Sequence, residues 1–324
     1  RFETPLLSFY SAWRPEGSQE LAILGNAAGG VGVAVVDRTG GSSDVVDAGV
    51  PYYFVWDPVG DGFVGHVNDS LRTFDLGAAS GDSSFPVTPN FRVPAMLADG
   101  SAGYVAVDNV LQSQGANAIV AVPRLEGAFV ADEARPVARY DGLASLVLSP
   151  DSSKLAVVVE GTLDNARVFN ASTHAGGFQS DQALDRGVHL IDTATDEIAT
   201  IASEPIAAAF WAPDSDHLAV LGFDSVGDGR PWVRWSVYNS SGELVSESPR
   251  VLLSGQFVGA YLPFFDQYAQ SISLWSPDST RLVFPGQSMA GRNGIWMHTI
   301  PMLGEEASTS FIAEGQLAIW SPAP

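Results

Sequence analysis

The sequence predicts an all-β protein, and more specifically a β-propeller of six blades with four antiparallel strands each. Three observations predict this fold. A unit of strand, proline turn and strand, clearest at residues 271–284, recurs from one end of the 324-residue chain to the other. Successive turns follow at steps of 40 to 64 residues, and a propeller blade takes roughly 40–50 residues. No helical periodicity is sustained over a dozen residues anywhere in the sequence.

The proline turn carries the repeat because each of its residues favours a chain reversal. Pro277 presets φ at the second position of a turn and removes a backbone donor, and the side chains of Asp278 and Ser279 cap such turns. One copy, 97–100, lacks proline, and the turn at Pro322 closes the chain. The other proline turns are at Pro15, Pro58, Pro150 and Pro213. We expect all of them on one face of the fold, since each joins the first strand of a blade to the second.

Blades one to three occupy the N-terminal part of the chain. Blade three is the least regular, because its turn lacks proline and the polar segment Gln112–Gly115 separates its second and third strands. The expected strands are 6–13, 21–24, 31–36 and 43–46 in blade one, 52–56 and 71–76 in blade two, and 104–107 and 118–122 in blade three.

Blades four to six are longer and more regular. The outer hairpin of blade four is expected at residues 189–201, where apolar and polar residues alternate around a turn. Blade five includes the strand 232–238 and the turn 239–242, and blade six ends with 310–312. The tail 316–322 resembles one more first strand. Six blades plus a terminal strand is the interpretation we prefer, and seven blades follow if the chain is a fragment of a longer protein. We expect residues 1–324 to form a single propeller domain.

Four tryptophans occupy one position of the repeat, directly before the turn: Trp13, Trp56, Trp211 and Trp275. We expect these side chains to pack between neighbouring blades.

The turn sequences resemble a known repeat. Ser149-Pro150-Asp151, Trp211-Ala212-Pro213-Asp214 and Trp275-Ser276-Pro277-Asp278 each precede an aliphatic strand. They are similar to the WD40-like repeat of TolB-like and dipeptidyl-peptidase-type β-propellers. The resemblance covers nearly the whole chain and implies a fold rather than a function, because a superfold hosts many unrelated sites.

Composition excludes several classes of function. The net charge of −21 repels phosphate backbones, so we expect no nucleic-acid partner. The absence of cysteine excludes disulfides, thiolate metal sites and a cysteine nucleophile. No stretch approaches the roughly 18–20 apolar residues of a membrane span. The sequence begins at Arg1 without Met, which is typical of a processed or trimmed N-terminus. Together with the TolB-like resemblance, this predicts an extracytoplasmic protein: periplasmic, secreted or surface-anchored.

No motif in the chain predicts catalysis, a metal or a cofactor. The nearest match to a serine-hydrolase elbow, Gly286–Ala290, lacks the last glycine. The five histidines share no metal-ligand spacing. The segments 57–62 and 224–229 resemble half a calcium loop, but Asn68 and Trp235 stand where the twelfth-position carboxylate would be, and turn chemistry explains them better.

The longest insertions lie in blades four to six, between second and third strands or between blades. Such connections emerge on the face opposite the proline turns, and aromatic and Arg side chains are enriched at protein-interface hot spots. The candidate partner-binding residues are Phe178, Arg230, Tyr261, Phe264, Phe265, Tyr268 and Arg292. In the alternative interpretation the insertions pack on each other and plug the channel mouth.

Three functional hypotheses remain open. The first is a non-catalytic, protein-binding scaffold or accessory subunit of an envelope or membrane complex, with a membrane-associated or envelope protein as its partner. The second is a small-molecule-binding or hydrolytic propeller, whose carboxylates at Asp181, Asp224, Asp228 and Asp266 would converge at the channel mouth. The third is the propeller part of a peptidase.

Overall fold

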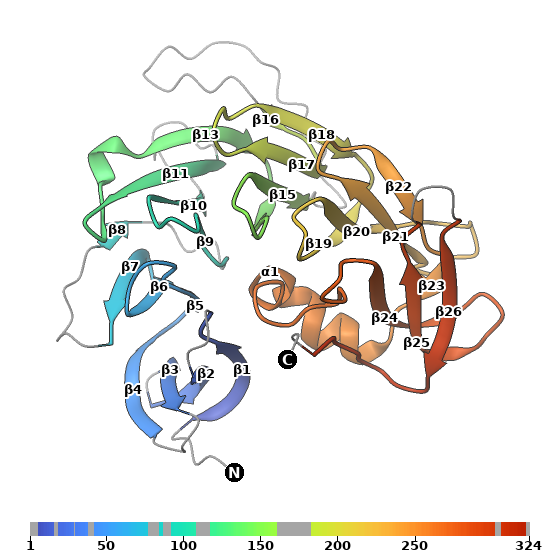
Figure 1. Cartoon of the computed structure of the whole chain (residues 1–324), viewed down its shortest axis with the longest axis horizontal. Coiled ribbons are helices and arrows are strands. Elements are labelled where there is room, and N and C mark those ends of the chain that lie inside the picture. The colour runs from blue at the N-terminus through green and yellow to red at the C-terminus, as the bar shows by residue number, and fades with distance from the viewer. Residues whose placement is uncertain are drawn as a thin grey trace. The chain divides into compact units, whose positions relative to one another are not determined.

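The computed structural model describes residues 6–15, 19–28, 30–37, 42–76, 84–86, 92–107, 117–160, 183–301 and 306–321. The chain divides into two compact units, Arg1–Arg139 and Tyr140–Pro324. Antiparallel sheets make up both units, and their strands follow the order of the predicted blades (Figure 1).

In the first unit, three sheets correspond to the predicted blades one to three. Each runs from its first strand to its last in sequence order. Blade one contains β1 (Leu7–Trp13), β2 (Glu20–Ala27), β3 (Gly30–Asp37) and β4 (Ser42–Gly49), and blade two contains β5 (Tyr52–Trp56), β6 (Gly62–Val67), β7 (Ser70–Asp75) and β8 (Ser84–Pro86). Blade three contains β9 (Ala95–Met96), β10 (Ala102–Val107), β11 (Asn117–Leu125) with the short β12 (Ala128–Phe129), the turn η1 (Ala131–Glu133) and β13 (Arg135–Tyr140).

In the second unit, the sheets correspond to blades four to six. Blade four contains β14 (Leu143–Leu148), β15 (Lys154–Glu160), β17 (Gly187–Asp192) and β18 (Ile198–Ala202). The two-residue strand β16 (Ala183–Leu184) precedes β17 in the chain and is not part of this sheet. Blade five contains β19 (Ile206–Trp211), β20 (His217–Phe223), β21 (Val233–Asn239) and β22 (Leu244–Glu247), and blade six contains β24 (Arg281–Ser288), β25 (Asn293–Thr299) and β26 (Ser308–Ala313). The two-residue strand β23 (Val251–Leu252) pairs with both β21 and β24 and so links blades five and six.

The second strands of blades four and five are continuous apolar runs because neighbouring sheets cover them on both sides. Leu155–Val159 of β15 and Leu218–Leu221 of β20 are buried throughout. Ala156 and Val158 of β15 and Leu218–Leu221 of β20 belong to one core that extends from blade four through blade six, in which Trp235 and Trp275 are the largest fully buried side chains. Burial on both faces is what a stack of packed sheets requires.

The proline turns of the second unit have one geometry. In each turn the N–H before the proline donates to a carbonyl across the turn at 2.8 Å: Ser149 to Lys154, Ala212 to His217 and Ser276 to Arg281. The turns also bond to each other, since the N–H groups of Asp151 and Asp214 donate to the hydroxyls of Ser215 and Ser279 of the next turn, each at 3.0 Å. Within this unit the prediction that the turns share a face is confirmed, and we call it the proline face.

Three of the four repeat tryptophans join neighbouring blades as predicted. The indole N–H of Trp211 donates to Val147 O at 2.9 Å, and that of Trp275 donates to Phe210 O at 2.9 Å. In the first unit Trp56 donates to Ala12 O at 3.1 Å. All three side chains are buried. For Trp13 the prediction is wrong, because its side chain is 53% exposed.

Two further predictions are wrong. The tail is not a strand between residues 316 and 321, and the first strand of blade six is reduced to a single bridge between Trp275 and Leu282. The hydroxyl of Ser273 explains the second difference, since it accepts from Trp275 N at 3.0 Å and donates to Trp275 O at 2.8 Å, in competition with a strand ladder.

The connection that enters blade six is helical, although no helix is expected there. It consists of the π-helical turn η2 (Phe257–Tyr261), the 3₁₀ turn η3 (Leu262–Phe264) and the single α-helical turn α1 (Phe265–Tyr268), which lies against β14 and β19. We call residues 257–268 the helical insertion. No helix in the described part of the chain is long and apolar enough to cross a membrane.

Candidate functional site

Most aromatic side chains of the helical insertion are part of the core. Phe257 stacks on Tyr261 with ring centroids 4.9 Å apart, and Tyr261 stacks on Tyr268 at 4.8 Å. Phe265 meets Phe210 of β19 edge-on at 5.9 Å. Tyr261 and Phe265 are only 3% and 1% exposed, and the Tyr261 hydroxyl donates to Ile272 O at 2.8 Å. The expectation that these two residues are exposed anchors is therefore wrong, since their rings fill space between the insertion and the sheets.

The other candidate residues differ in exposure. Phe264 is 44% exposed. Arg230 is largely exposed and lies 3.9 Å from Asp228, whereas the guanidinium of Arg292 lies 3.4 Å from the ring centroid of Phe311. Tyr268 is half-buried, and burial raises its pKa. Phe178, together with Asp181, lies outside the described residues.

Exposed apolar side chains gather at one end of the strands in the second unit. Connections from second to third strands, and from one blade to the next, emerge opposite the proline face; we call this end the loop face. The exposed large apolar side chains on these connections, or on strand ends beside them, are Leu143, Phe223, Val226, Val258, Phe264 and Met289. At the proline face of the same unit only Leu244 is comparably exposed among the described residues. Ile312, Leu317 and Ile319 are exposed on the last strand and the segment after it.

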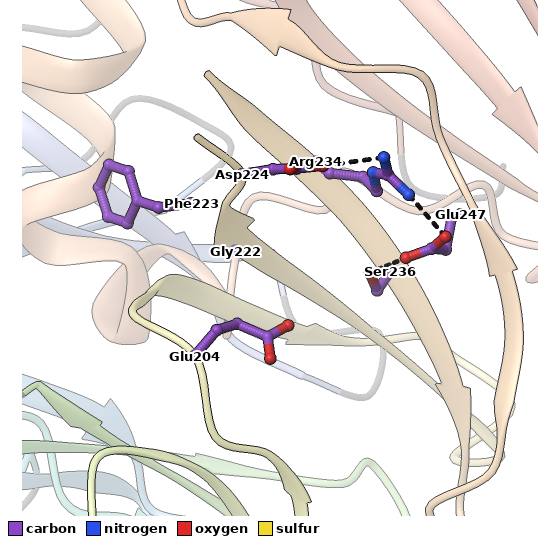
Figure 2. Close-up of a pocket in the computed structure, with 7 residues that line it drawn as sticks. All are labelled: Glu204, Gly222, Phe223, Asp224, Arg234, Ser236 and Glu247. Carbon is purple, nitrogen blue, oxygen red and sulfur yellow. Dashed lines mark hydrogen bonds and ion pairs between the residues drawn. The ribbon is translucent and has the colours of Figure 1, made fainter. Parts of the chain in front are cut away.

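A polar cavity of about 200 Å³ opens at the same loop face, on the side of blade five that faces blade four (Figure 2). Strand register creates it. Gly222 of β20 lies opposite Arg234 of β21, and Ser236 lies opposite Glu247 of β22, so these residues share one face of the sheet. Trp235, between them in sequence, points to the other face and packs against Phe210 and Phe284. The lining residues are Glu204, Gly222, Phe223, Asp224, Arg234, Ser236 and Glu247.

Ion pairs fix most charged groups of the cavity. Arg234 bridges two carboxylates, with 2.8 Å to Asp224 and 2.7 Å to Glu247. Arg250 adds a second guanidinium to Asp224, at 2.9 Å and 3.0 Å. The Ser236 hydroxyl donates to the second oxygen of Glu247 at 3.4 Å. Both terminal nitrogens of Arg234 are therefore engaged with protein carboxylates.

Glu204 differs from the other acids of the cavity. It is an exposed residue that follows β18, and within the described part of the chain its carboxylate forms no hydrogen bond or ion pair. One carboxylate oxygen lies 3.6 Å from the point where Gly222 would carry a Cβ, so the glycine leaves space beside it. Figure 2 shows Glu204 opposite Ser236 and Glu247 across the cavity. Sequence analysis missed this site; its one local signal is the alternation of polar Arg234 and Ser236 with apolar Val233, Trp235 and Val237 in β21.

The expected meeting of carboxylates at a channel mouth is not found among the described residues. Asp224 is paired with two arginines, and Asp228 accepts from Trp232 Nε1 at 2.9 Å and from Arg230 N at 3.0 Å. The hydrogen bond from Trp232 lowers the pKa of Asp228. Asp266 is buried in α1. No group of three or more His, Asp or Glu in the described ranges is arranged to hold a metal ion.

Comparison with solved structures identifies the fold. Over 93% of this chain and 77% of the other, the protein is similar to an oligogalacturonate lyase from Vibrio parahaemolyticus, with a TM-score of 0.59 and 12% identity. The β-propeller domain of Cps50 (Swd1) from Myceliophteria thermophila gives a TM-score of 0.52 at 11% identity over 95% of this chain and 88% of that one. The chain has a β-propeller fold.

A third similarity shows how widely this fold is used. Prolyl oligopeptidase B from Galerina marginata gives a TM-score of 0.56 at 11% identity, covering 93% of this chain but 41% of that one. The search of family models found no match, and no curated protein matches the sequence. At these identities the similarities show the propeller fold alone, and they do not select TolB-like propellers over the others.

Proposed function

We propose that this β-propeller is a non-catalytic scaffold that binds a protein partner through the loop face of its second unit. The observation that carries the proposal is the distribution of exposed apolar side chains: Phe223, Val226, Val258, Phe264 and Met289 lie at the loop face, and only Leu244 among the described residues lies at the proline face. Side chains on the loops of a rigid scaffold commonly carry binding, and grouped apolar side chains mark interaction surfaces.

The charged groups near the loop face support binding rather than catalysis. Asp224 and Asp228 are held by arginine and tryptophan donors, so neither is poised as an acid or a base. The hydrolytic or small-molecule alternative named Asp181, Asp224, Asp228 and Asp266; of the three that are described, Asp224 and Asp228 are engaged with separate donors and Asp266 is buried in α1. The peptidase alternative rests on a shared fold, which leaves function open.

We further propose that the protein is extracytoplasmic, and that its partner belongs to an envelope or membrane complex. The support is the resemblance of the turns at Pro150, Pro213 and Pro277 to the TolB-like repeat. Fractionation of the native cells tests this proposal. A protein found only in the cytoplasm would remove the localisation and the envelope partner from the proposal, but not the binding face.

Site-specific photocrosslinking tests the binding face. A photoreactive amino acid is placed at Phe264, at Phe223 or, as a control on the other face, at Leu244, which is similarly exposed at 54%. We expect one discrete crosslinked protein from the native membrane fraction at positions 264 and 223 and none at 244.

Matched substitutions complete the test. Phe264→Asp should abolish capture of that protein, because interface energy is concentrated in a few apolar anchors. Leu244→Asp introduces the same charge at the proline face and should leave capture intact. Equal crosslinking from both faces, or unchanged capture by Phe264→Asp, would contradict the proposal.

A further inference from the structure

We infer that the cavity of blade five receives a basic side chain, lysine or arginine, of the bound protein. This inference rests on the proposed function and specifies the chemistry of the partner. The cavity carries a net negative charge. Three carboxylates, those of Glu204, Asp224 and Glu247, lie near two guanidinium groups, those of Arg234 and Arg250, so one negative charge is in excess.

The excess negative charge lies on the carboxylate of Glu204. Arg234 and Arg250 are engaged with Asp224 and Glu247 at 2.7 to 3.0 Å. Glu204, by contrast, has no hydrogen bond or ion pair to any described residue. A cation bound here would gain charge-assisted hydrogen bonds from Glu204, and the Ser236 hydroxyl and one oxygen of Glu247 lie on the opposite wall.

An anionic ligand does not suit the same cavity. Both terminal nitrogens of Arg234 already bind protein carboxylates, so an incoming anion would meet Glu204 without a free guanidinium fork to receive it. The overall charge of −21 also favours approach of a basic partner.

The rim of the cavity suits the alkyl part of a lysine or arginine. Phe223 is 47% exposed and lies at the rim, on the side away from Glu247 in Figure 2. Lysine and arginine lay their methylene stems along apolar surface and keep the charged head in a polar site. The cavity of about 200 Å³ accommodates one such side chain, and the missing side chain at Gly222 keeps its floor open.

Titration of the intact protein with a defined peptide tests the inference. The probe is a capped heptapeptide with one central lysine between Gly and Ser residues, and a heptapeptide with norleucine at that position is its neutral control. Binding is followed by chemical-shift changes of the backbone amides. We expect the changes at Gly222, Phe223 and Ser236 with the lysine peptide only.

Two variants separate this cavity from general attraction to an acidic protein. Each variant removes one exposed carboxylate: Glu204→Gln removes the one at the cavity, and Glu197→Gln removes one in the hairpin between β17 and β18. The affinity should fall about two- to fivefold in Glu204→Gln, as expected for one exposed charge pair, and much less in Glu197→Gln. Gly222→Val, which changes no charge, should also weaken binding by narrowing the cavity.

Equal losses in Glu204→Gln and Glu197→Gln would overturn the inference, because binding would then follow net charge alone. Spermidine, the free-cation probe, would overturn it as well if it bound the cavity while the lysine peptide did not. The proposed function has a separate readout. If Glu204→Gln captures the crosslinked partner as well as the wild type does, the cavity is not used, whereas the binding face itself is contradicted only by the variants of Phe264 and Leu244.

Discussion

Replacing Trp275 with alanine should be among the most destabilising single changes in this protein. Trp275 is 1% exposed and lies between blades five and six, where its indole N–H donates to Phe210 O at 2.9 Å. Truncating a fully buried tryptophan costs about 3–5 kcal/mol of unfolding free energy. The buried carbonyl of Phe210 also loses its donor, and an unsatisfied buried acceptor costs about 1–3 kcal/mol. We therefore expect a loss at the upper end of the first range.

Urea unfolding followed by far-ultraviolet circular dichroism measures this loss without using tryptophan fluorescence. Trp275→Phe keeps most of the apolar volume, so it should lower the unfolding free energy less than Trp275→Ala does. The loss that Trp275→Phe still shows would reflect mainly the missing N–H donor. Trp13→Ala is the matched control: Trp13 has the same repeat position but is 53% exposed, so its loss should stay within about 1 kcal/mol. A loss below about 1 kcal/mol for Trp275→Ala would refute the view that these indoles hold neighbouring blades together.

Two further predictions concern buried charges and protons. Burial lowers the pKa of His298 from 6.5 to about 4, so the histidine is protonated at a higher pH in the unfolded chain than in the folded protein. The urea midpoint should therefore fall as the pH falls from about 6.5 to 4, and it should fall less in His298→Gln. The same pH dependence in His298→Gln as in the wild type would contradict this role of His298. Asp57 forms an ion pair with Arg124 at 2.6 Å, and the two side chains are only 9% and 2% exposed. Asp57→Ala leaves the buried guanidinium unpaired, so we expect it to lower the unfolding free energy, measured in urea, by about 3–5 kcal/mol. The more exposed pair of Arg14 and Glu20 is its control: Glu20→Ala should cost at most about 1 kcal/mol, and equal losses would contradict the role of burial.

The repeat could be predicted from the sequence because its information is local. Proline, aspartate and serine determine the turn within a few residues, and the structure shows the same hydrogen bond across the turns at Pro150, Pro213 and Pro277. The positive φ of Ser152, Ser215 and Ser279, between 59° and 64°, repeats at one position of the turn. The indole bonds follow from the same repeat, since a residue fixed relative to the turn meets the same carbonyl in each preceding blade.

The helical insertion could not be predicted from its sequence because it contains no regular helix. η2, η3 and α1 have different hydrogen-bond periods and are five, three and four residues long, so no 3.6-residue pattern builds up. Its aromatic residues were expected to be exposed because they lie on a long connection. The stacking of Phe257, Tyr261 and Tyr268 is a tertiary contact that composition does not reveal.

The polar cavity was missed for a different reason. Its side chains come from three strands and from the connections between β18 and β19 and between β20 and β21, and Glu247 lies 43 positions after Glu204. Only strand register brings them to one face, and register depends on pairing that a search for local motifs does not resolve. Part of the candidate set, such as Phe264 and Arg230, is exposed as expected; whether it binds a partner stays a prediction.

Adjacent residues of the helical insertion provide the last prediction. Phe264 is 44% exposed and Phe265 is 1% exposed, because the chain turns from η3 into α1 between them and directs the second ring against Phe210. Phe265→Ala should therefore cost about 3–5 kcal/mol in urea unfolding, whereas Phe264→Ala, which removes the same atoms one residue earlier, should cost no more than about 1 kcal/mol. The two variants have the same amino-acid composition, so a difference in their stability reflects only the position of the removed ring. Equal losses would mean that Phe264 is also a core residue, and the partner-binding role that we assign to it would then have to be withdrawn.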